Sequence, residues 1–437
     1  MLSRQDNELL TRVGPGTPMG ELLRRFWMPA LLEDEVAEPD GDPVRLRLLG
    51  EDLVAFRDTN GRVGILDAYC PHRMAHLYFG RNEECGLRCV YHGWKFDVDG
   101  NCVDQPSEPG ETNFARKVSI TSYPAAVRGG VVWVYMGPPL SDHGKMPALP
   151  DFEWSYLPPA RRIAVKRQQT CNWAQAVEGG IDSSHISYLH RGLDPAHPVN
   201  KGMPGGRLSG EDRHPVFDVR EVEHGLLIGA RRELKSENKH YWRITPFLLP
   251  FYTMIPGGAR EPGNPAPYFQ GHAWVPIDDE NTWTWSFGAN PGREMTEQER
   301  DFFGGRENYW GPVDETYQPR FNRTNDYGLD RAIQRVGNFT GIKGIPNQDA
   351  AVQESMGPIV PRWKEHLGSS DSAIIQWRKL MLRLVRELER GKEPDAPHHG
   401  EWYNVRSVSV LIDPNADWQE EAEPFRHGGT ITKHAAA

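Results

Sequence analysis

Two short segments each carry a cysteine and a histidine at a spacing that could bind a metal. Cys70 and His72 are separated by one residue, sixteen residues follow, and Cys89 and His92 are separated by two. Thiolates and imidazoles on two loops can bind either a tetrahedral zinc ion or a [2Fe–2S] cluster. Zinc fingers usually pair like with like, whereas here each loop supplies one cysteine and one histidine. The arrangement favours a cluster in which one iron takes both thiolates and the other takes both imidazoles.

The remaining cysteines have no comparable partners in the sequence. Cys85, Cys102 and Cys171 are expected to pack as small apolar side chains, and His76 is expected to be an incidental histidine beside the first pair.

A second group of metal-binding residue types lies in the segment NWAQAVEGGIDSSHISYLH. Glu178, Asp182 and His185 fall at positions i, i+4 and i+7, which share one stripe of a helix. His190 is about 140° further round an ideal helix than His185, so both can reach one metal only if the helix distorts or ends between them. Two histidines with a carboxylate form the facial triad of non-haem iron sites. The alternative is a polar helix face without a metal.

The elements that must position these residues indicate two domains. Residues 43–67 alternate between apolar and polar side chains, with turn signals at Gly50 and at Asn60-Gly61. A second strand-rich run, GGVVWVYM, covers residues 129–136. The first domain is therefore expected to be a small all-β unit.

The second domain is expected to be mixed. Residues 215–290 contain several strand candidates, and residues 371–391 have apolar side chains at the helical period with Gly391 as a stop signal. A helix is predicted there.

Bulk properties narrow the class of protein. A chain of 437 residues is too long for one simple core, and a net charge of −10 gives no support to a nucleic-acid partner. The sequence contains no apolar signal region and no stretch long enough to span a bilayer, so a cytoplasmic protein is expected. Five cysteines in a chain of this length disfavour a disulfide scaffold.

These motifs resemble those of the Rieske non-haem iron aromatic ring-hydroxylating oxygenases. Pro71 after the first cysteine and Gly93-Trp94 after the second histidine are features of that family. The Asp-x-x-His-x4-His spacing ending at His190 is similar to its mononuclear iron motif. The likeness covers nearly the whole chain and is greatest for the phthalate dioxygenase-like branch. One departure is Met74, where the family usually has glycine.

The resemblance implies an α+β protein. Its parts would be an N-terminal helical segment at 1–40, an all-β Rieske [2Fe–2S] domain at 41–140, a linker at 141–155, and a mixed, helix-grip-like catalytic domain with an antiparallel sheet at 156–437.

The resemblance also implies a role for each candidate residue. Cys70, His72, Cys89 and His92 would bind the cluster, and His185 and His190 would bind a mononuclear Fe(II).

Residue chemistry does not select the third iron ligand among many carboxylates. The segment GIPNQDAAVQESMGP places Asp349 five residues before Glu354, as in the family's late Asp-x4-Glu element, which implies Asp349. Asp182 would not be a ligand but a hydrogen-bonded bridge from His185 to His92 of a neighbouring subunit. Glu178 and Asn172 are expected to lie just outside the ligands.

The implied function is that of a terminal oxygenase that cis-dihydroxylates an aromatic carboxylate such as a phthalate or substituted benzoate. The implied partners are an NADH-dependent flavin and iron–sulfur reductase and further copies of the chain in a trimer or stacked hexamer. A substrate carboxylate needs a buried cation, for which Arg243, within the apolar run HYWRITPFLLPFY, and Arg207, within GMPGGRLSG, are candidates. Each could equally form a structural salt bridge.

Three alternatives remain open at this stage. The same iron site could cleave an aryl ether as an O-demethylase. A Rieske electron carrier without oxygenase chemistry would contain two irons per chain rather than three. A zinc-stabilised binding module would lack visible absorption.

Overall fold

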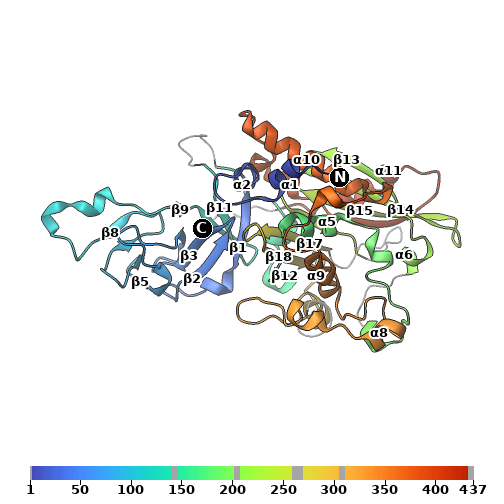
Figure 1. Cartoon of the computed structure of the whole chain (residues 1–437), viewed down its shortest axis with the longest axis horizontal. Helices are drawn as coiled ribbons and strands as arrows, with labels where there is room; N and C mark the ends of the chain where they lie inside the picture. Colours follow the sequence, from blue (N-terminus) through green and yellow to red (C-terminus); the bar gives the residue numbers. More distant parts are fainter. Residues whose placement is uncertain (1, 139–145, 201–206, 258–268, 305–310, 432–437) are drawn as a thin grey trace. The chain divides into compact units, whose positions relative to one another are not determined.

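The computed structural model describes residues 2–138, 146–200, 207–257, 269–304 and 311–431 (Figure 1). These residues form two compact units, Val13–Pro147 and Met1–Arg12 with Ala148–Ala437. Part of the predicted linker at 141–155 lies outside the described residues. Within the described chain, no helix is both long and apolar enough to cross a membrane.

The sheets of the unit Val13–Pro147 are all made of short antiparallel strands, which confirms the all-β prediction. Its three sheets have the strand orders β1-β11-β10, β2-β3-β4-β9 and β5-β6-β7-β8, and one helix, α2 (Pro18–Arg24), precedes them. The strands are β1 (Trp27–Leu32), β2 (Val44–Leu48), β3 (Glu51–Arg57), β4 (Val63–Asp67), β5 (Arg81–Glu83), β6 (Gly86–Arg88), β7 (Lys95–Phe96), β8 (Cys102–Asp104), β9 (Ser122–Tyr123), β10 (Ala125–Arg128) and β11 (Val131–Tyr135).

The hairpin between β2 and β3 shows why the sequence forms these strands. Leu49 and Gly50 connect them with φ values of 47° and 78°. Positive φ at both central residues is what a two-residue hairpin with the natural strand twist requires. The pairing puts Leu46 of β2 opposite Leu53 of β3, so these two buried residues share one face, while Val54 and Phe56 of β3 face the other way into a separate core cluster.

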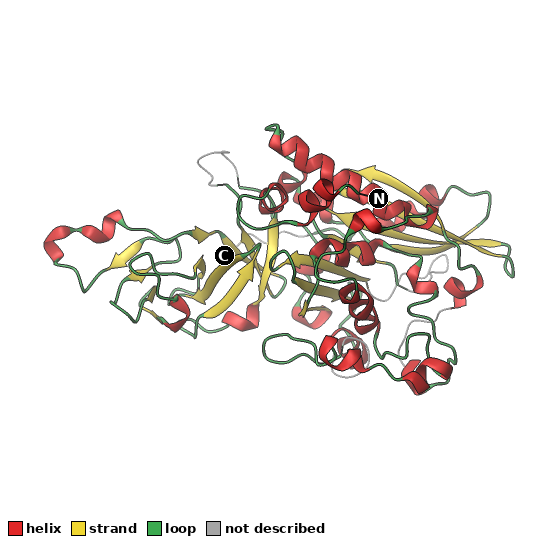
Figure 2. Ribbon diagram, in the orientation of Figure 1, coloured by secondary structure: helices red, strands yellow, loops and turns green. Residues whose placement is uncertain are grey.

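The second unit is organised around an eight-stranded antiparallel sheet, as predicted for a mixed domain (Figure 2). The strand order is β12-β18-β17-β16-β15-β14-β13, and β19 pairs with β15 outside this path. The strands are β12 (Arg162–Gln169), β13 (Val216–Val222), β14 (Gly225–Leu234), β15 (Lys239–Leu248), β16 (Tyr252–Ile255), β17 (Phe269–Pro276), β18 (Thr282–Ala289) and β19 (Val408–Ile412).

Helices of this unit pack against the sheet and against one another. The predicted helix near 371–391 is confirmed as α10, and Gly391 beyond its end has a φ of 84°. The helices are α1 (Arg4–Thr11), α4 (Glu153–Tyr156), α5 (Trp173–Ile181), α6 (Arg207–Glu211), α7 (Glu297–Gly304), α8 (Arg331–Val336), α9 (Ile345–Ser355), α10 (Ser372–Glu389) and α11 (Trp418–Arg426). Helix α5 contacts β16, β17, α9, α10 and α1, so it lies at the centre of this packing.

A buried ion network fixes α5 against its neighbours. The Glu178 carboxylate accepts hydrogen bonds from Arg362 Nε (2.9 Å) and Nη2 (3.0 Å) and from Arg378 Nε (2.7 Å) on α10. Arg378 also donates to Glu365, and Arg362 donates to Asn7 on α1. Burial opposes ionisation of Glu178, but the two arginines outweigh it, so its pKa lies below the usual value. The network contains two cations and two anions and ties α1, α5 and α10 together.

Replacing Arg378 with methionine should lower the free energy of unfolding by about 3 kcal/mol, because Glu178 would lose a charged partner while remaining buried. Arg383 on the same helix is exposed and pairs with Glu221, so Arg383→Met should cost less than about 1 kcal/mol. Urea unfolding followed by tryptophan fluorescence measures both values. Equal costs for the two variants would contradict a structural role for the buried network.

Candidate metal centres and substrate cavity

The two loops with the Cys-His pairs share one backbone design. The Met74 amide donates to the Cys70 carbonyl (2.8 Å), and the Gly93 amide donates to the Cys89 carbonyl (2.9 Å). The amide of each cysteine donates to the carbonyl five residues further on. Met74 and Gly93 both have positive φ, 59° and 79°. This position therefore suits glycine, and methionine adopts the conformation at a cost of about 1 kcal/mol. Met74 leaves the loop geometry intact, with its side chain exposed.

The side chains of the two loops form two groups, one with both thiols and one with both imidazoles. The Cys70 and Cys89 thiols are buried and lie within hydrogen-bonding reach of each other; burial raises the pKa of Cys70 to about 11. The His72 and His92 rings lie 4.4 Å apart between centroids, and His72 stacks on Trp94. The buried Nδ1 of His72 has no hydrogen-bond partner among the described residues. Paired thiols, paired imidazoles and an unpartnered ring nitrogen fit the donor set of a [2Fe–2S] cluster with mixed ligands.

The other three cysteines and His76 make contacts that are typical of structural residues. All five cysteines of the chain are free of disulfides. Cys102 and Cys171 are buried, and Cys85 accepts a hydrogen bond from Asn60. His76 Nδ1 accepts from the Tyr78 amide and caps a short 3₁₀ turn.

Helix α5 ends at Ile181, and Asp182 caps its C-terminus. A stripe of Glu178, Asp182 and His185 along one helix would need α5 to continue as far as His185. The expectation of one continuous helical face is therefore wrong. Asp182 accepts a hydrogen bond from the Ser184 amide (2.6 Å), so its side chain competes with the helical hydrogen bonds. His185 then lies in a separate 3₁₀ turn, His185–Ser187. The change of direction lets both histidines approach one point.

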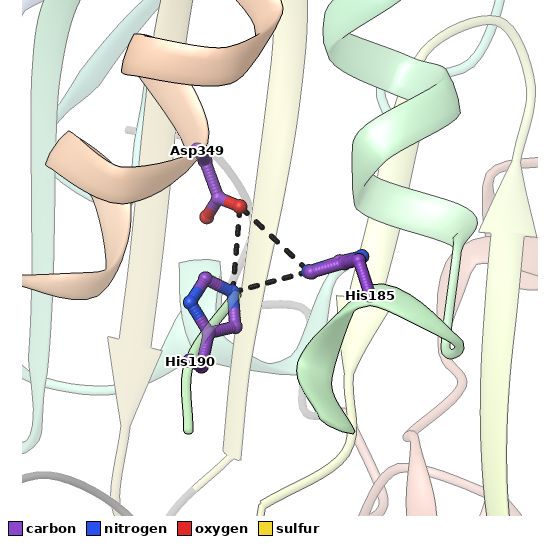
Figure 3. Close-up of side chains that lie close together, drawn as sticks. All are labelled: His185, His190 and Asp349. Atoms are coloured by element: carbon purple, nitrogen blue, oxygen red, sulfur yellow. Dashed lines mark hydrogen bonds and ion pairs between the residues drawn. The ribbon is translucent and has the colours of Figure 1, made fainter. Parts of the chain in front are cut away.

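His185, His190 and Asp349 converge from two separate segments of the chain (Figure 3). The Nε2 atoms of the two histidines lie 3.1 Å apart. Asp349 Oδ1 lies 3.3 Å from Nε2 of His190 and 3.7 Å from Nε2 of His185. One ligand atom from each residue lies within 4.8 Å of the others. Two imidazoles and one carboxylate on one side of a point, with a cavity beside them, fit a facial iron triad.

Each imidazole also has a polar partner at Nδ1, the ring nitrogen that is not part of the converging set of ligand atoms. His185 Nδ1 lies 3.5 Å from Asp182 Oδ2, and His190 Nδ1 lies 2.8 Å from Gln348 Oε1. Gln348 is itself buried and donates from Nε2 to the Ile342 carbonyl (2.9 Å), which fixes its amide so that Oε1 accepts from His190. Both contacts favour the tautomer with the proton on Nδ1, which leaves Nε2 of each ring available to a metal.

Close approach between α5 and its neighbours depends on Gly179 and Gly180. A Cβ on Gly179 would lie 2.1 Å from the Gln353 amide of α9, and one on Gly180 would lie 2.9 Å from the Trp274 ring of β17. Larger residues would push α5 away from the helix that carries Asp349. The two glycines therefore allow the ligand-bearing segments to meet.

The three converging residues line a cavity of about 320 Å³. Much of its wall is apolar, including Ile181, Ile186, Leu208, Ile255 and Trp274. Arg243 also lines it, and its only hydrogen bond among the described residues is a long one from Nη1 to the Tyr241 hydroxyl (3.5 Å). Arg243 Nε is buried without a partner in the described chain. The cavity can therefore take an apolar ring with an anionic group.

The other predicted residues lie in different surroundings. Glu178 belongs to the buried ion network and Asn172 caps α5 while donating to the Thr11 and Asp279 carbonyls. Neither lines the cavity. Arg207 begins α6, but its side chain lies outside the described part of the structure.

Sequence reasoning missed several polar residues that surround the triad. Gln348, Tyr241, Gln353 and His272 gave no signal, because their importance comes from contacts between distant segments. The only available cue was that Gln348 directly precedes the proposed ligand Asp349.

Comparison with known proteins agrees with both centres. A model described as "Rieske [2Fe-2S] domain" matches residues 26–124, and one described as "LigXa C-terminal domain like" matches residues 134–431. The chain is 40% identical to the phthalate 4,5-dioxygenase oxygenase subunit of Pseudomonas putida, covering 96% of this chain and 94% of that protein. It is 38% identical to the 3-chlorobenzoate-3,4-dioxygenase oxygenase subunit of Comamonas testosteroni, covering 97% and 98%.

Among solved structures, dicamba monooxygenase bound to dicamba superposes with a TM-score of 0.57 at 19% identity, covering 84% of this chain and 99% of that one. This likeness supports the fold. The two domain matches and the near-complete coverage of the relatives show that the chain belongs to the Rieske non-haem iron aromatic ring-hydroxylating oxygenases, as a terminal oxygenase subunit of the phthalate dioxygenase-like branch.

Proposed function

We propose that this protein uses O2 and electrons from a separate reductase to cis-dihydroxylate an aromatic carboxylate, such as a phthalate or substituted benzoate. The observation that carries the proposal is the convergence of His185, His190 and Asp349 at the wall of a cavity that also contains Arg243. The names of the relatives, which act on phthalate and on 3-chlorobenzoate, support this class of substrate.

We assign the cofactors of this family to particular residues. Cys70 and Cys89 would hold one iron of the cluster and His72 and His92 the other. His185, His190 and Asp349 would hold the mononuclear iron. When bound, the two centres supply electron transfer and activation of O2.

The polypeptide would contribute positioning. Arg243 would pair with the substrate carboxylate, because a partly buried guanidinium with no ion pair among the described residues gains most from such a ligand. The apolar wall would hold the ring and exclude water, and a cavity of about 320 Å³ lies at the small end of ligand sites, which suits a single ring. Asp182 and Gln348 would keep the two imidazoles in the ligand tautomer.

Asp182 would also link subunits. The carboxylate is near His185 and could accept a hydrogen bond from His92 of a neighbouring subunit, in a homo-trimer or stacked hexamer. Hydrogen bonding to His185 outweighs the effect of burial and lowers the pKa of Asp182, so it is anionic and can accept two such bonds. The electron donor would be an NADH-dependent flavin and iron–sulfur reductase.

Product analysis tests the proposed reaction. With NADH and a competent reductase, the enzyme should couple O2 uptake to conversion of phthalate, 3-chlorobenzoate or 3-methoxybenzoate. Mass spectrometry should show a product that has gained two oxygen and two hydrogen atoms. Release of formaldehyde from methoxybenzoate would instead indicate ether cleavage. An absence of coupled O2 uptake with every aromatic acid would refute the carboxylate assignment.

Replacing Asp182 with asparagine should leave both iron centres populated but abolish turnover, because the amide cannot accept a hydrogen bond from each imidazole as the anion does. Iron analysis and single-turnover assays measure the two effects. Asp194→Asn, at an exposed aspartate nearby in sequence, is the control and should be fully active. Near-normal turnover of Asp182→Asn would contradict the bridge.

Replacing Arg243 with glutamine should raise the Kd for phthalate by about 10- to 100-fold, because the carboxylate would lose its buried cation. Calorimetric titration of the anaerobic holoenzyme measures the Kd. Arg220→Gln removes an exposed arginine that pairs with Asp218, and it should leave the Kd unchanged. If Arg243→Gln binds phthalate as tightly as the wild type, another group anchors the substrate.

A further inference from the structure

Arg232 on β14 is completely buried, yet it has no anionic partner in the described chain. Its exposed fraction is 0%, and no carboxylate of the described residues forms an ion pair with it, although the charges of Asp212 and Asp182 act on it from further away. Its hydrogen bonds go to the Ser183 carbonyl, to Ser183 Oγ (3.3 Å) and to Ser187 Oγ (3.4 Å), while Nε has no described partner. Burying a guanidinium charge that is not paired with a carboxylate costs folding free energy, so we expect Arg232 to have a specific role.

The partners of Arg232 lie in the turn that presents a proposed iron ligand. Ser183 follows Asp182, and Ser187 ends the 3₁₀ turn that begins at His185. One rigid guanidinium thus contacts both ends of the segment that carries the His185 ring. Since α5 has already ended, the backbone bonds at this segment are those of a short turn, such as the Ser187 amide to the Ser184 carbonyl (3.3 Å) and the Tyr188 amide to the His185 carbonyl (2.9 Å). Arg232 therefore supplies the bracing that helical structure would otherwise provide.

Arg232 is also next to the proposed substrate cation. In the pairing of β14 with β15, Arg232 is opposite Tyr241 and Ala230 is opposite Arg243. Paired residues and residues two apart share a face, so Arg232, Tyr241 and Arg243 lie on the same face of the sheet. Burial, followed by repulsion from Arg243, lowers the pKa of Arg232 to about 10. Two like charges on adjacent strands attract an anion more strongly than either charge alone.

We propose that Arg232 is a positioning residue that braces the Ser183–Ser187 turn and, through its charge beside Arg243, couples carboxylate binding to the geometry of the His185 site. The second part rests on the proposed function. A carboxylate at Arg243 relieves the repulsion between the two guanidinium groups and so stabilises Arg232 against the turn. By linkage, the braced turn favours carboxylate binding to the same extent.

The test compares three variants of the full-length holoenzyme under anaerobic conditions. Arg232→Gln removes both the charge and the bracing, whereas Arg232→Lys keeps the charge but lacks the planar guanidinium that contacts both serines. Arg231→Gln removes one charge from the neighbouring position, whose side chain faces the opposite side of the strand. The readouts are the EPR signal of the ferrous centre with nitric oxide, without aromatic ligand, and the Kd values of benzoate and benzamide.

Arg232→Gln should broaden the nitrosyl EPR signal into several species and weaken benzoate by about tenfold or more, while benzamide changes by less than about twofold. Arg232→Lys should give a benzoate Kd between those of the wild type and Arg232→Gln, because it keeps the charge but loses the braced turn, and it should still broaden the signal. Arg231→Gln should match the wild type in both readouts.

Wild-type behaviour of Arg232→Gln in both readouts would overturn the proposal. A single narrow EPR signal for Arg232→Lys would show that Arg232 does not brace the turn. This variant provides the test if Arg232→Gln does not fold. If the wild type binds benzamide as tightly as benzoate, the carboxylate substrate is wrong, and the EPR comparison still tests the bracing.

Discussion

The geometry of the catalytic unit depends on bringing three ligand atoms from two distant segments to within 4.8 Å of one another. Two imidazoles and a carboxylate reach this spacing only if the surrounding structure holds the segments that carry them. The chain does so by ending α5 before Asp182, by allowing close packing at Gly179 and Gly180, and by holding α5 with the buried network around Glu178. The first device is local to the Asp182–Ser184 turn, whereas the other two are contacts that α5 makes with α9, with β17 and with the two arginines of the network.

The cavity beside the triad adds a second constraint, which is electrostatic. Its apolar wall places the Arg243 guanidinium in a site of low dielectric, with Arg232 beside it on the neighbouring strand β14, whereas the carboxylates Asp182 and Asp349 lie at the histidines. Such a site favours an aromatic anion over a neutral ring of the same shape. The strands that carry these cations also support the turn with His185, so recognition of the substrate and positioning of the iron ligand share one framework.

Sequence reasoning worked best where function depends on local spacing. Cys70, His72, Cys89 and His92 could be recognised because both loops are short and self-contained, and the structure sorts their side chains into thiols and imidazoles. The strands of residues 43–67 and the helix α10 were predictable from periodicity. Asp349 required the resemblance, since no local pattern separates it from other carboxylates. Gln348 and Arg232 were missed because their roles arise only from contacts between distant segments, and the end of α5 was missed because Asp182 competes with the helix.

The proposed function requires His185, His190 and Asp349 to bind an iron separate from the cluster. Mössbauer spectroscopy of the ⁵⁷Fe-enriched, anaerobically reduced protein tests it most directly. We expect two cluster irons and one high-spin ferrous iron per chain, with only the last lost in His190→Ala. A wild-type spectrum with cluster iron alone, or a third iron that survives His190→Ala, would show that these three residues do not bind a separate iron.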